Sequence, residues 1–244
     1  MKFPYGVSDF YQMVTEGYFY VDRTDRIPLL EDLGKQLLFL RPRRFGKSLL
    51  LSMLENYYDV AKADQFERLF GDLAIGRAPT PQRNQYFVMR WDFSMVAAYG
   101  DANEITQALH DHVNSRIARF AECYRERIAS PIEIHSDNAI ASFESLLTAI
   151  ASTPHKLYLL IDEYDNFANE LAMGGQPTGK QRYDALLRGE GALKTLFKAI
   201  KGAASGFGLD RVFITGVSPV VLSDLTSGYN VSETITLQPE FNDL

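Results

Sequence analysis

Two short segments carry the residue types that phosphate chemistry requires. The first is the stretch Arg43-Arg44-Phe45-Gly46-Lys47-Ser48-Leu49, which we expect to surround the phosphates of a nucleotide. A glycine at the start of a helix lets a phosphate approach backbone N–H groups, whose partial positive charge attracts anions. We expect Lys47 to reach the β- and γ-phosphates and Ser48 to place its hydroxyl on Mg²⁺. The tripeptide Gly-Lys-Ser is a weak signal alone, because common residues often occur together by chance.

The second segment is Asp162-Glu163, which follows the apolar run Leu157 to Ile161. One carboxylate at the end of a buried strand can bind Mg²⁺, and the next can orient or deprotonate an attacking water. We therefore expect Asp162 to share the metal with Ser48, and Glu163 to act on the water. The structural alternatives are a solvated lysine at position 47, a helix-capping Asp162 and a plain surface Glu163.

Residues around these two segments have roles that the pattern leaves open. A polar residue on a neighbouring strand often faces the γ-phosphate in such enzymes, and Thr215 and Ser218 are the candidates for this catalytic role. The alternative is that Thr215 ends its strand and Ser218 begins a turn. Asp165 either caps a helix or supports the site. Arg43 and Arg44 either contact phosphates or lie in solvent or against a partner.

The elements that must position these residues alternate between strands and helices. Short apolar runs predict strands at Gln36–Leu40, Tyr86–Trp91, Leu157–Ile161, Arg211–Thr215 and Ser232–Leu237. Helical spacing of apolar residues predicts helices at Ile27–Leu33, from Lys47 onward, at Asn103–Ala129, at Asn138–Ser152 and at Tyr183–Ala203. Three glycines and a proline predict a loop at Met173–Lys180. Right-handed crossovers between such strands give a mainly parallel sheet covered on both faces.

Composition narrows the class of protein. The chain has 244 residues, 46% of them hydrophobic, which is enough for one sizeable core. The net charge of −6 gives no support to a large nucleic-acid face. The single cysteine, Cys123, cannot form an internal disulfide, and we expect a buried, inert thiol. No signal peptide or membrane-spanning run is present, so we expect a cytoplasmic protein with no membrane partner.

Two other kinds of site find no support in the sequence. The four histidines, at positions 110, 112, 135 and 155, have no paired spacing with cysteines, which argues against a zinc cage. The Gly-x-Ser-x-Gly turn of serine hydrolases is absent. One feature also departs from the usual phosphate loop, in which four residues separate the first glycine from Gly-Lys-Ser. Arg41 stands at that position, followed by Pro42.

The sequence resembles the bacterial AAA-ATPase-like family in four segments: Gly17–Thr24, Phe39–Leu49, Leu159–Asp165 and Phe213–Pro219. Arg41 in place of the first glycine agrees with that family, so the departure does not argue for a dead site. The resemblance implies an α/β three-layer P-loop NTPase core with a mainly parallel five-stranded sheet, of the additional-strand, catalytic-glutamate type. It also implies ATP and Mg²⁺ as cofactors. We expect residues 1–35 to form an arm packed on a core of residues 36–244.

Members of this family often continue into a small helical region and then a nuclease-like domain of the Asp-(Asp/Glu)-x-Lys type. This sequence ends before either, which predicts a core without a C-terminal lid and a partner domain outside this chain. We expect Mg-dependent ATP binding and slow hydrolysis, which an arginine from a second subunit of a homo-oligomer would accelerate. The alternatives are a nucleotide-gated binding module with negligible turnover, and the ATPase part of a DNA-associated defence or mobile-element system.

Overall fold

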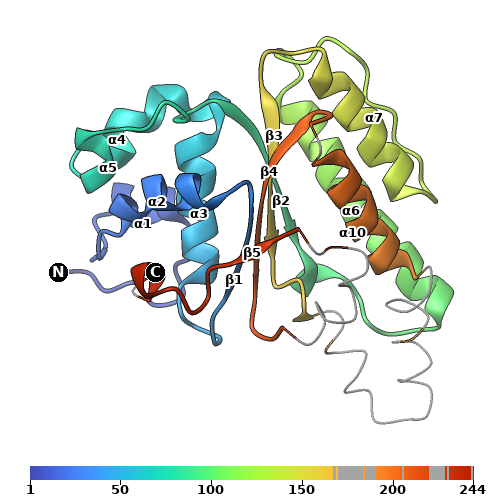
Figure 1. Cartoon of the computed structure of the whole chain (residues 1–244), viewed down its shortest axis with the longest axis horizontal. Helices are drawn as coiled ribbons and strands as arrows, with labels where there is room; N and C mark the ends of the chain where they lie inside the picture. Colours follow the sequence, from blue (N-terminus) through green and yellow to red (C-terminus); the bar gives the residue numbers. More distant parts are fainter. Residues whose placement is uncertain are drawn as a thin grey trace.

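A five-stranded sheet forms the centre of the molecule (Figure 1). The computed structural model describes residues 1–166, 169, 184, 191–204, 206–219, 229, 231–242 and 244. All strand pairs are parallel, and the order across the sheet is β2-β3-β4-β1-β5. The strands are β1 (Gln36–Leu40), β2 (Tyr86–Asp92), β3 (Lys156–Asp162), β4 (Leu209–Gly216) and β5 (Glu233–Thr234). Strand β4 therefore lies between β1 and β3 as the additional strand of the expected fold.

Helices cover both faces of the sheet and make it the middle of three layers (Figure 1). One face carries α1 (Phe10–Thr15), α2 (Ile27–Leu33), α3 (Lys47–Tyr58), α4 (Phe66–Phe70) and α5 (Ala74–Arg77). The other face carries α6 (Ala102–Cys123), α7 (Ala139–Ala151) and α10 (Ala192–Ala203). Short 3-10 helices occupy Thr24–Arg26, Val60–Gln65, Phe93–Met95 and Pro239–Phe241. The expected α/β three-layer fold is confirmed.

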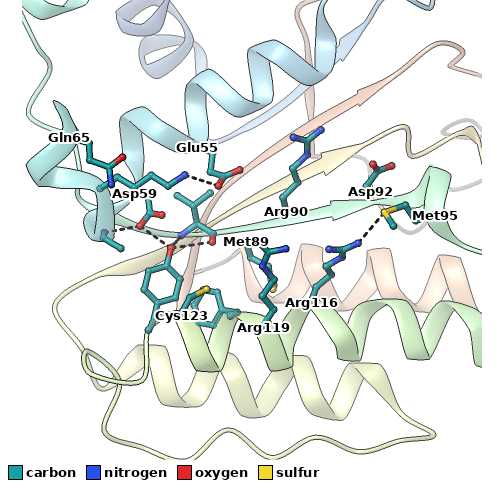
Figure 2. A pocket seen from close by; sticks show the side chains of 15 residues that line it. Glu55, Asp59, Gln65, Met89, Arg90, Asp92, Met95, Arg116, Arg119 and Cys123 are labelled. Carbon is teal, nitrogen blue, oxygen red and sulfur yellow. Dashed lines mark hydrogen bonds and ion pairs between the residues drawn. The ribbon is translucent and has the colours of Figure 1, made fainter. Parts of the chain in front are cut away.

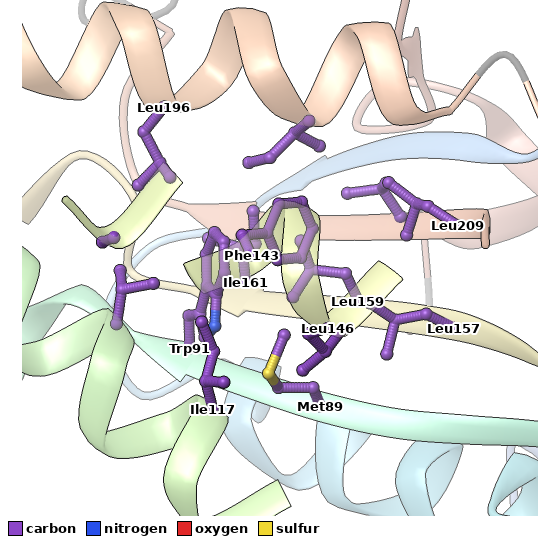
Figure 3. Packing of buried hydrophobic residues seen from close by; sticks show 14 of the residues in the cluster. Met89, Trp91, Ile117, Phe143, Leu146, Leu157, Leu159, Ile161, Leu196 and Leu209 are labelled. Atoms are coloured by element: carbon purple, nitrogen blue, oxygen red, sulfur yellow. The ribbon is translucent and has the colours of Figure 1, made fainter. Parts of the chain in front are cut away.

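The strands are apolar on both sides because each face of the sheet is covered. Successive side chains of a strand point to opposite faces. Accordingly Leu37 and Phe39 of β1 belong to the core under α3, whereas Leu38 belongs to the core under α6 and α7. Figure 3 shows the second of these cores, in which residues of β2 and β3 pack against Phe143 and Leu146 of α7. This double burial explains why the strands appear in the sequence as continuous apolar runs.

The segment before β1 packs on α3. The backbone N–H of Phe10 donates to Ser52 Oγ at 2.9 Å, and the Phe10 ring stacks on Phe70 with ring centroids 5.0 Å apart. Ile27 and Leu30 are buried in the same core cluster. The division into an arm of residues 1–35 and a core of residues 36–244 stays a prediction. In the described part of the chain, no helix combines the length and the apolar character needed to cross a membrane.

Three expectations from the sequence were wrong. Helix α6 ends at Cys123 instead of Ala129, because Tyr124 leaves the helix and its hydroxyl bonds to the backbone of Val88 and to Asp59. Cys123 is exposed, since it lies on the last turn of α6 away from the core. The last strand is only Glu233–Thr234, because the chain turns after Ile235 donates to Leu38 O.

The helices predicted at Ile27–Leu33, from Lys47 onward and at Asn138–Ser152 agree with the structure within a residue at the ends that were predicted. Helix α7 begins after Asn138, whose side chain accepts the Ala141 N–H. A fourth expectation was wrong in part: the predicted helix Tyr183–Ala203 is not continuous. Gly191 has a non-helical ψ of 148° and is the N-cap after which α10 begins at Ala192. The predicted loop Met173–Lys180 lies outside the described residues.

Candidate functional site

The loop between β1 and α3 opens at the carboxyl edge of the sheet. Residues 42–46 are exposed, and Gly46 adopts a φ of 82° just before α3 begins. Arg44 also has a positive φ, 70°. A non-glycine residue in this left-handed region is uncommon and marks a backbone that its surroundings constrain. Gly46 makes no side-chain cap, so the first N–H groups of α3 face the loop without a capping side chain.

Lys47 lies inside the curve of this loop. Its side chain is buried, and Nζ donates to the carbonyl oxygens of Arg41 at 2.9 Å and Pro42 at 3.1 Å. These neutral acceptors satisfy the ammonium group without neutralising its charge. A phosphate at the start of α3 would therefore offer Lys47 a stronger, charged acceptor at the same place.

Asp162 is the centre of the hydrogen-bond network beside the loop. Its side chain is almost fully buried at the end of β3. Ser48 Oγ donates to Asp162 Oδ2 at 2.8 Å, and Thr215 Oγ1 donates to Asp162 Oδ1 at 2.6 Å. The hydroxyl of α3 and the hydroxyl of β4 thus hold the two carboxylate oxygens in a fixed orientation. Of the residues expected from the sequence, the structure brings together Lys47, Ser48, Asp162 and Thr215.

Arg90 on β2 is a contact that the sequence reasoning missed. Its Nη2 forms an ion pair with Asp162 Oδ2 at 2.5 Å. Arg90 interrupts the otherwise apolar run of Tyr86 to Trp91, and that interruption was the available signal. The sequence could not show that Arg90 pairs with Asp162, because the pairing of β2 with β3 brings together segments that are far apart in the chain.

Glu163 follows Asp162 in a strained conformation. Its φ is 49°, in the left-handed region that disfavours a side chain, so the structure around it must hold it there. Burial raises the pKa of the Glu163 carboxyl, the charge of Asp162 raises it further, and the charge of Lys47 opposes this. A carboxyl with a raised pKa is a better proton acceptor, because basicity rises with pKa.

Asp165 joins the end of β3 to the turn after β4. It is buried, and its carboxylate accepts the backbone N–H of Ser218 at 2.6 Å and of Val217 at 3.1 Å. A Cβ on Gly216 would lie 2.5 Å from the ring of Tyr164 and 2.6 Å from Asp165 Oδ1, so only glycine fits there. Of the two alternatives for Asp165, the structure shows support of the strand ends that carry Asp162 and Thr215.

The other expected loop residues do not gather around Asp162. Arg43 Nη2 donates to Asn166 Oδ1 at 3.2 Å near the surface. Arg44 and Phe45 are exposed. Leu49 lines a small apolar cleft of about 190 Å³ that also includes Gly46 and lies between the first residues of the chain and α3.

The fold, the loop and the Asp162 network agree with what the comparisons found. A family model described as Predicted AAA-ATPase matches residues 4–226. The chain belongs to this family. The membership expected from the four sequence segments is therefore confirmed, and it indicates AAA-ATPase-like nucleotide binding. No curated protein and no solved structure was found to match the chain.

Arg41 has a structural task in this predicted AAA-ATPase. Its Nη1 donates to Thr236 O, its Nη2 donates to Phe241 O at 2.7 Å, and its guanidinium lies 4.5 Å from the centre of the Phe39 ring. The side chain is therefore directed at the segment after β5 and away from Lys47. Arg41 stands where the usual phosphate loop has glycine. Its side chain connects this loop to the segment that follows β5.

The donor set of this predicted AAA-ATPase fits a magnesium ion better than a protein-caged metal. Among the described residues no three His, Cys, Asp or Glu side chains gather at a metal-binding distance. Mg²⁺ commonly takes one or two protein oxygens and completes its shell with water and phosphate oxygens. Ser48 and Asp162, with their side-chain oxygens in contact, supply such a pair.

Proposed function

We propose that this chain binds Mg-ATP at the β1–α3 loop and hydrolyses it slowly. The observation that carries the proposal is the pair of hydrogen bonds from Ser48 and Thr215 to Asp162, next to the buried Lys47. Ser48 and Asp162 would hold the metal, and Lys47 would leave the two loop carbonyls for the β- and γ-phosphates. Bound Mg²⁺ neutralises developing charge on the phosphates.

Glu163 is proposed to orient and deprotonate the attacking water. Its raised pKa and its place beside Asp162 support this role. Thr215 is proposed to act through Asp162, whose orientation it fixes, and Ser218 contributes its backbone to the Asp165 turn. Gly46, Arg43, Arg44 and Phe45 form the exposed loop over the phosphates.

The base of the nucleotide is proposed to lie in the apolar cleft beside the loop. Gly46 belongs to both the loop and the cleft, so a ligand whose phosphates meet the loop has the cleft within reach. Leu49 and Met53 of α3 form one wall and Phe19 and Tyr20 another. Flat apolar surfaces of this kind suit a nucleobase, because it is an aromatic ring.

One observation favours a second candidate, a nucleotide-gated module with negligible turnover. Lys47 and Asp162 are both engaged by the protein itself, Lys47 by loop carbonyls and Asp162 by Arg90. Binding of Mg-ATP must exchange both sets of contacts, and such an exchange can drive a change of shape without hydrolysis. A cytoplasmic location, a homo-oligomer, a nuclease-like effector and a DNA-associated system stay predictions of the sequence.

ATP affinity and steady-state phosphate release, measured on the same preparation, test the proposal. We expect saturable, Mg-dependent binding of ATP, with phosphate release well below the ~10 s⁻¹ median of enzymes. Saturable binding with phosphate release no faster than that of Glu163→Gln would favour the gated module. Absence of Mg-dependent binding in the folded protein would contradict both.

A further inference from the structure

A groove runs beside β2, the edge strand of the sheet, and Arg90 is one of the residues that line it (Figure 2). It encloses a cavity of about 560 Å³, which lies in the range of small-molecule sites. Three arginines line it, Arg90 from β2 and Arg116 and Arg119 from α6. Figure 2 shows Arg116 and Arg119 side by side on α6, both extended toward β2.

The carboxylates that line the groove are already engaged. Glu55 forms an ion pair of 2.8 Å with Lys62. Asp59 accepts the Tyr124 hydroxyl at 2.9 Å, and burial raises the pKa of its carboxyl. Asp92 accepts both the N–H and the hydroxyl of Ser94. Glu55 is thus neutralised by Lys62, whereas Asp59 and Asp92 are held by neutral donors. Among the described residues, none of the three carboxylates forms an ion pair with Arg116 or Arg119.

The guanidinium groups of α6 lack acceptors of matching strength. Arg116 Nη2 contacts Met95 Sδ at 3.2 Å, and a thioether is only a weak acceptor. Arg116 Nε is buried without a hydrogen-bond partner among the described residues. Within that same part of the chain, Arg119 has no ion pair. The buried Nε and the weak thioether contact leave Arg116 with donor capacity that an oxyanion in the groove can use.

Apolar side chains line another part of the groove. Met89, Phe120 and Tyr124 line it and are buried. We propose that the groove binds a small organic anion, with its carboxylate or phosphate group on Arg116 and Arg119 and an apolar body against Met89 and Phe120. Guanidinium groups bind both kinds of oxyanion in a bidentate manner, which is the chemistry that the two groups share.

Arg90 connects this groove to the nucleotide site. It lines the groove and also holds Asp162, the residue proposed to bind Mg²⁺. The positive guanidinium of Arg90, paired with the Asp162 carboxylate, opposes the binding of a metal cation to the same carboxylate. An anion in the groove gives Arg90 an alternative partner and so frees Asp162 for the metal. This coupling rests on the proposed function, whereas the anion site does not.

Cys123 provides a direct test of the anion site. It is the single cysteine of the chain, it is exposed, and it lines the groove. We would measure its rate of alkylation by iodoacetamide without nucleotide, in the presence of increasing phenyl phosphate or phenylacetate. The two probes distinguish a phosphate from a carboxylate ligand. Either probe, by filling the groove, should slow alkylation in a saturable manner.

Variants decide whether the protection comes from the arginines. Arg116→Ala/Arg119→Ala should weaken probe binding about tenfold or more, the usual cost of lost charge-assisted bonds. The single variant Arg119→Glu covers the case in which the double variant does not fold, because Arg119 is exposed. Arg125→Ala is the matched control, since Arg125 lies just past α6 and pairs with Glu122 away from the groove. Lys47→Ala should also keep full protection.

Two results would overturn the anion site, namely no protection by either probe and equal protection in the Arg119→Glu protein. The coupling is tested separately by the Mg²⁺ concentration that gives half-maximal ATP binding. The effective probe should lower this concentration in the wild type and leave it unchanged in Arg90→Gln. An unchanged Mg²⁺ requirement in the wild type overturns the coupling. Absence of ATP binding by the wild type, with Cys123 protection intact, would instead contradict the proposed function alone.

Discussion

Thr215 on β4 donates a hydrogen bond of 2.6 Å to Asp162 on the neighbouring strand β3. Both side chains are buried at the carboxyl edge of the sheet, where parallel strands end together. The bond uses one oxygen of Asp162 and leaves the other to Ser48 and Arg90. The orientation of the proposed metal ligand is thus set by the additional strand of the fold.

Removal of the Thr215 hydroxyl should lower the free energy of unfolding and weaken Mg²⁺ binding. In Thr215→Val the buried Asp162 oxygen loses its partner, which costs about 1–3 kcal/mol of unfolding free energy. We also expect a higher Mg²⁺ requirement for ATP binding, because Asp162 is no longer held in place. Urea denaturation and ATP titrations at several Mg²⁺ concentrations would measure these effects. Thr215→Ser keeps the hydroxyl and should behave nearly as wild type. An equal defect in both variants would contradict the role of the hydroxyl, because only Thr215→Val removes it.

Lys47→Ala should weaken ATP binding by roughly ten- to hundredfold, since a charge-assisted contact to phosphate is worth about 1.5–3 kcal/mol. Fluorescence or calorimetric titration with Mg-ATP would measure the loss. Lys156→Ala, at the opposite end of β3, is the control for loss of a lysine and should bind as wild type. Unchanged affinity in a folded Lys47→Ala protein would rule out the phosphate-loop assignment.

Glu163→Gln should retain Mg-ATP binding while hydrolysis falls about 10²-fold or more, the range for loss of a general base. The pH dependence gives a second criterion. Because the pKa of Glu163 is raised, the carboxyl becomes protonated at a higher pH than the ordinary value of about 4.3. The wild-type rate should therefore fall as the pH drops through this raised pKa, and the residual rate of Glu163→Gln should lack that limb. Equal turnover by both proteins would move the base role elsewhere, with Asp165 the next candidate.

Arg41→Gly restores the glycine that usual phosphate loops have at this position, and we expect it to damage stability more than binding. The substitution removes the bonds to Thr236 O and Phe241 O and the contact with Phe39. Loss of hydrogen bonds from a charged donor should lower the unfolding free energy by about 2 kcal/mol or more. Thermal unfolding and ATP titration would be compared with those of Lys47→Ala. An affinity loss as large as that of Lys47→Ala would assign Arg41 to the phosphates.

His112 should make the fold sensitive to acid. Burial lowers the pKa of His112 to about 4, Arg116 adds to the shift, and Asp92 opposes it. Between pH 6.5 and 4 the unfolded chain binds a proton that the folded protein does not, so the unfolding free energy falls as the pH falls. The full loss is on the order of 3 kcal/mol.

Urea denaturation of the wild type and His112→Leu at pH 7 and pH 4.5 would test this. The variant should lose less stability between the two pH values, since it has no histidine to protonate. His110→Leu, on the same helix, is the matched control and should follow the wild-type curve. Parallel losses in the wild type and His112→Leu would show that other groups cause the acid sensitivity.

The elements that the sequence predicted well are those whose signals are local. The strands Gln36–Leu40 and Leu157–Ile161 are apolar runs because both faces of the sheet are covered. Helix α3 begins at Lys47, as the change from loop residues to helical spacing indicated. The parallel sheet followed from the alternation of strands and helices, because the chain can return to a parallel strand only through a crossover.

The tertiary structure decided what depends on segments that lie far apart in the chain. Only the strand order places Thr215 and Arg90 on either side of Asp162, and only the packing of Tyr124 against β2 ends α6 and leaves Cys123 at the groove. Arg41 similarly finds its partners near the end of the chain. A sequence pattern records the preferences of neighbouring residues. The direction of a charged side chain is set instead by the acceptors that the folded sheet brings within its reach.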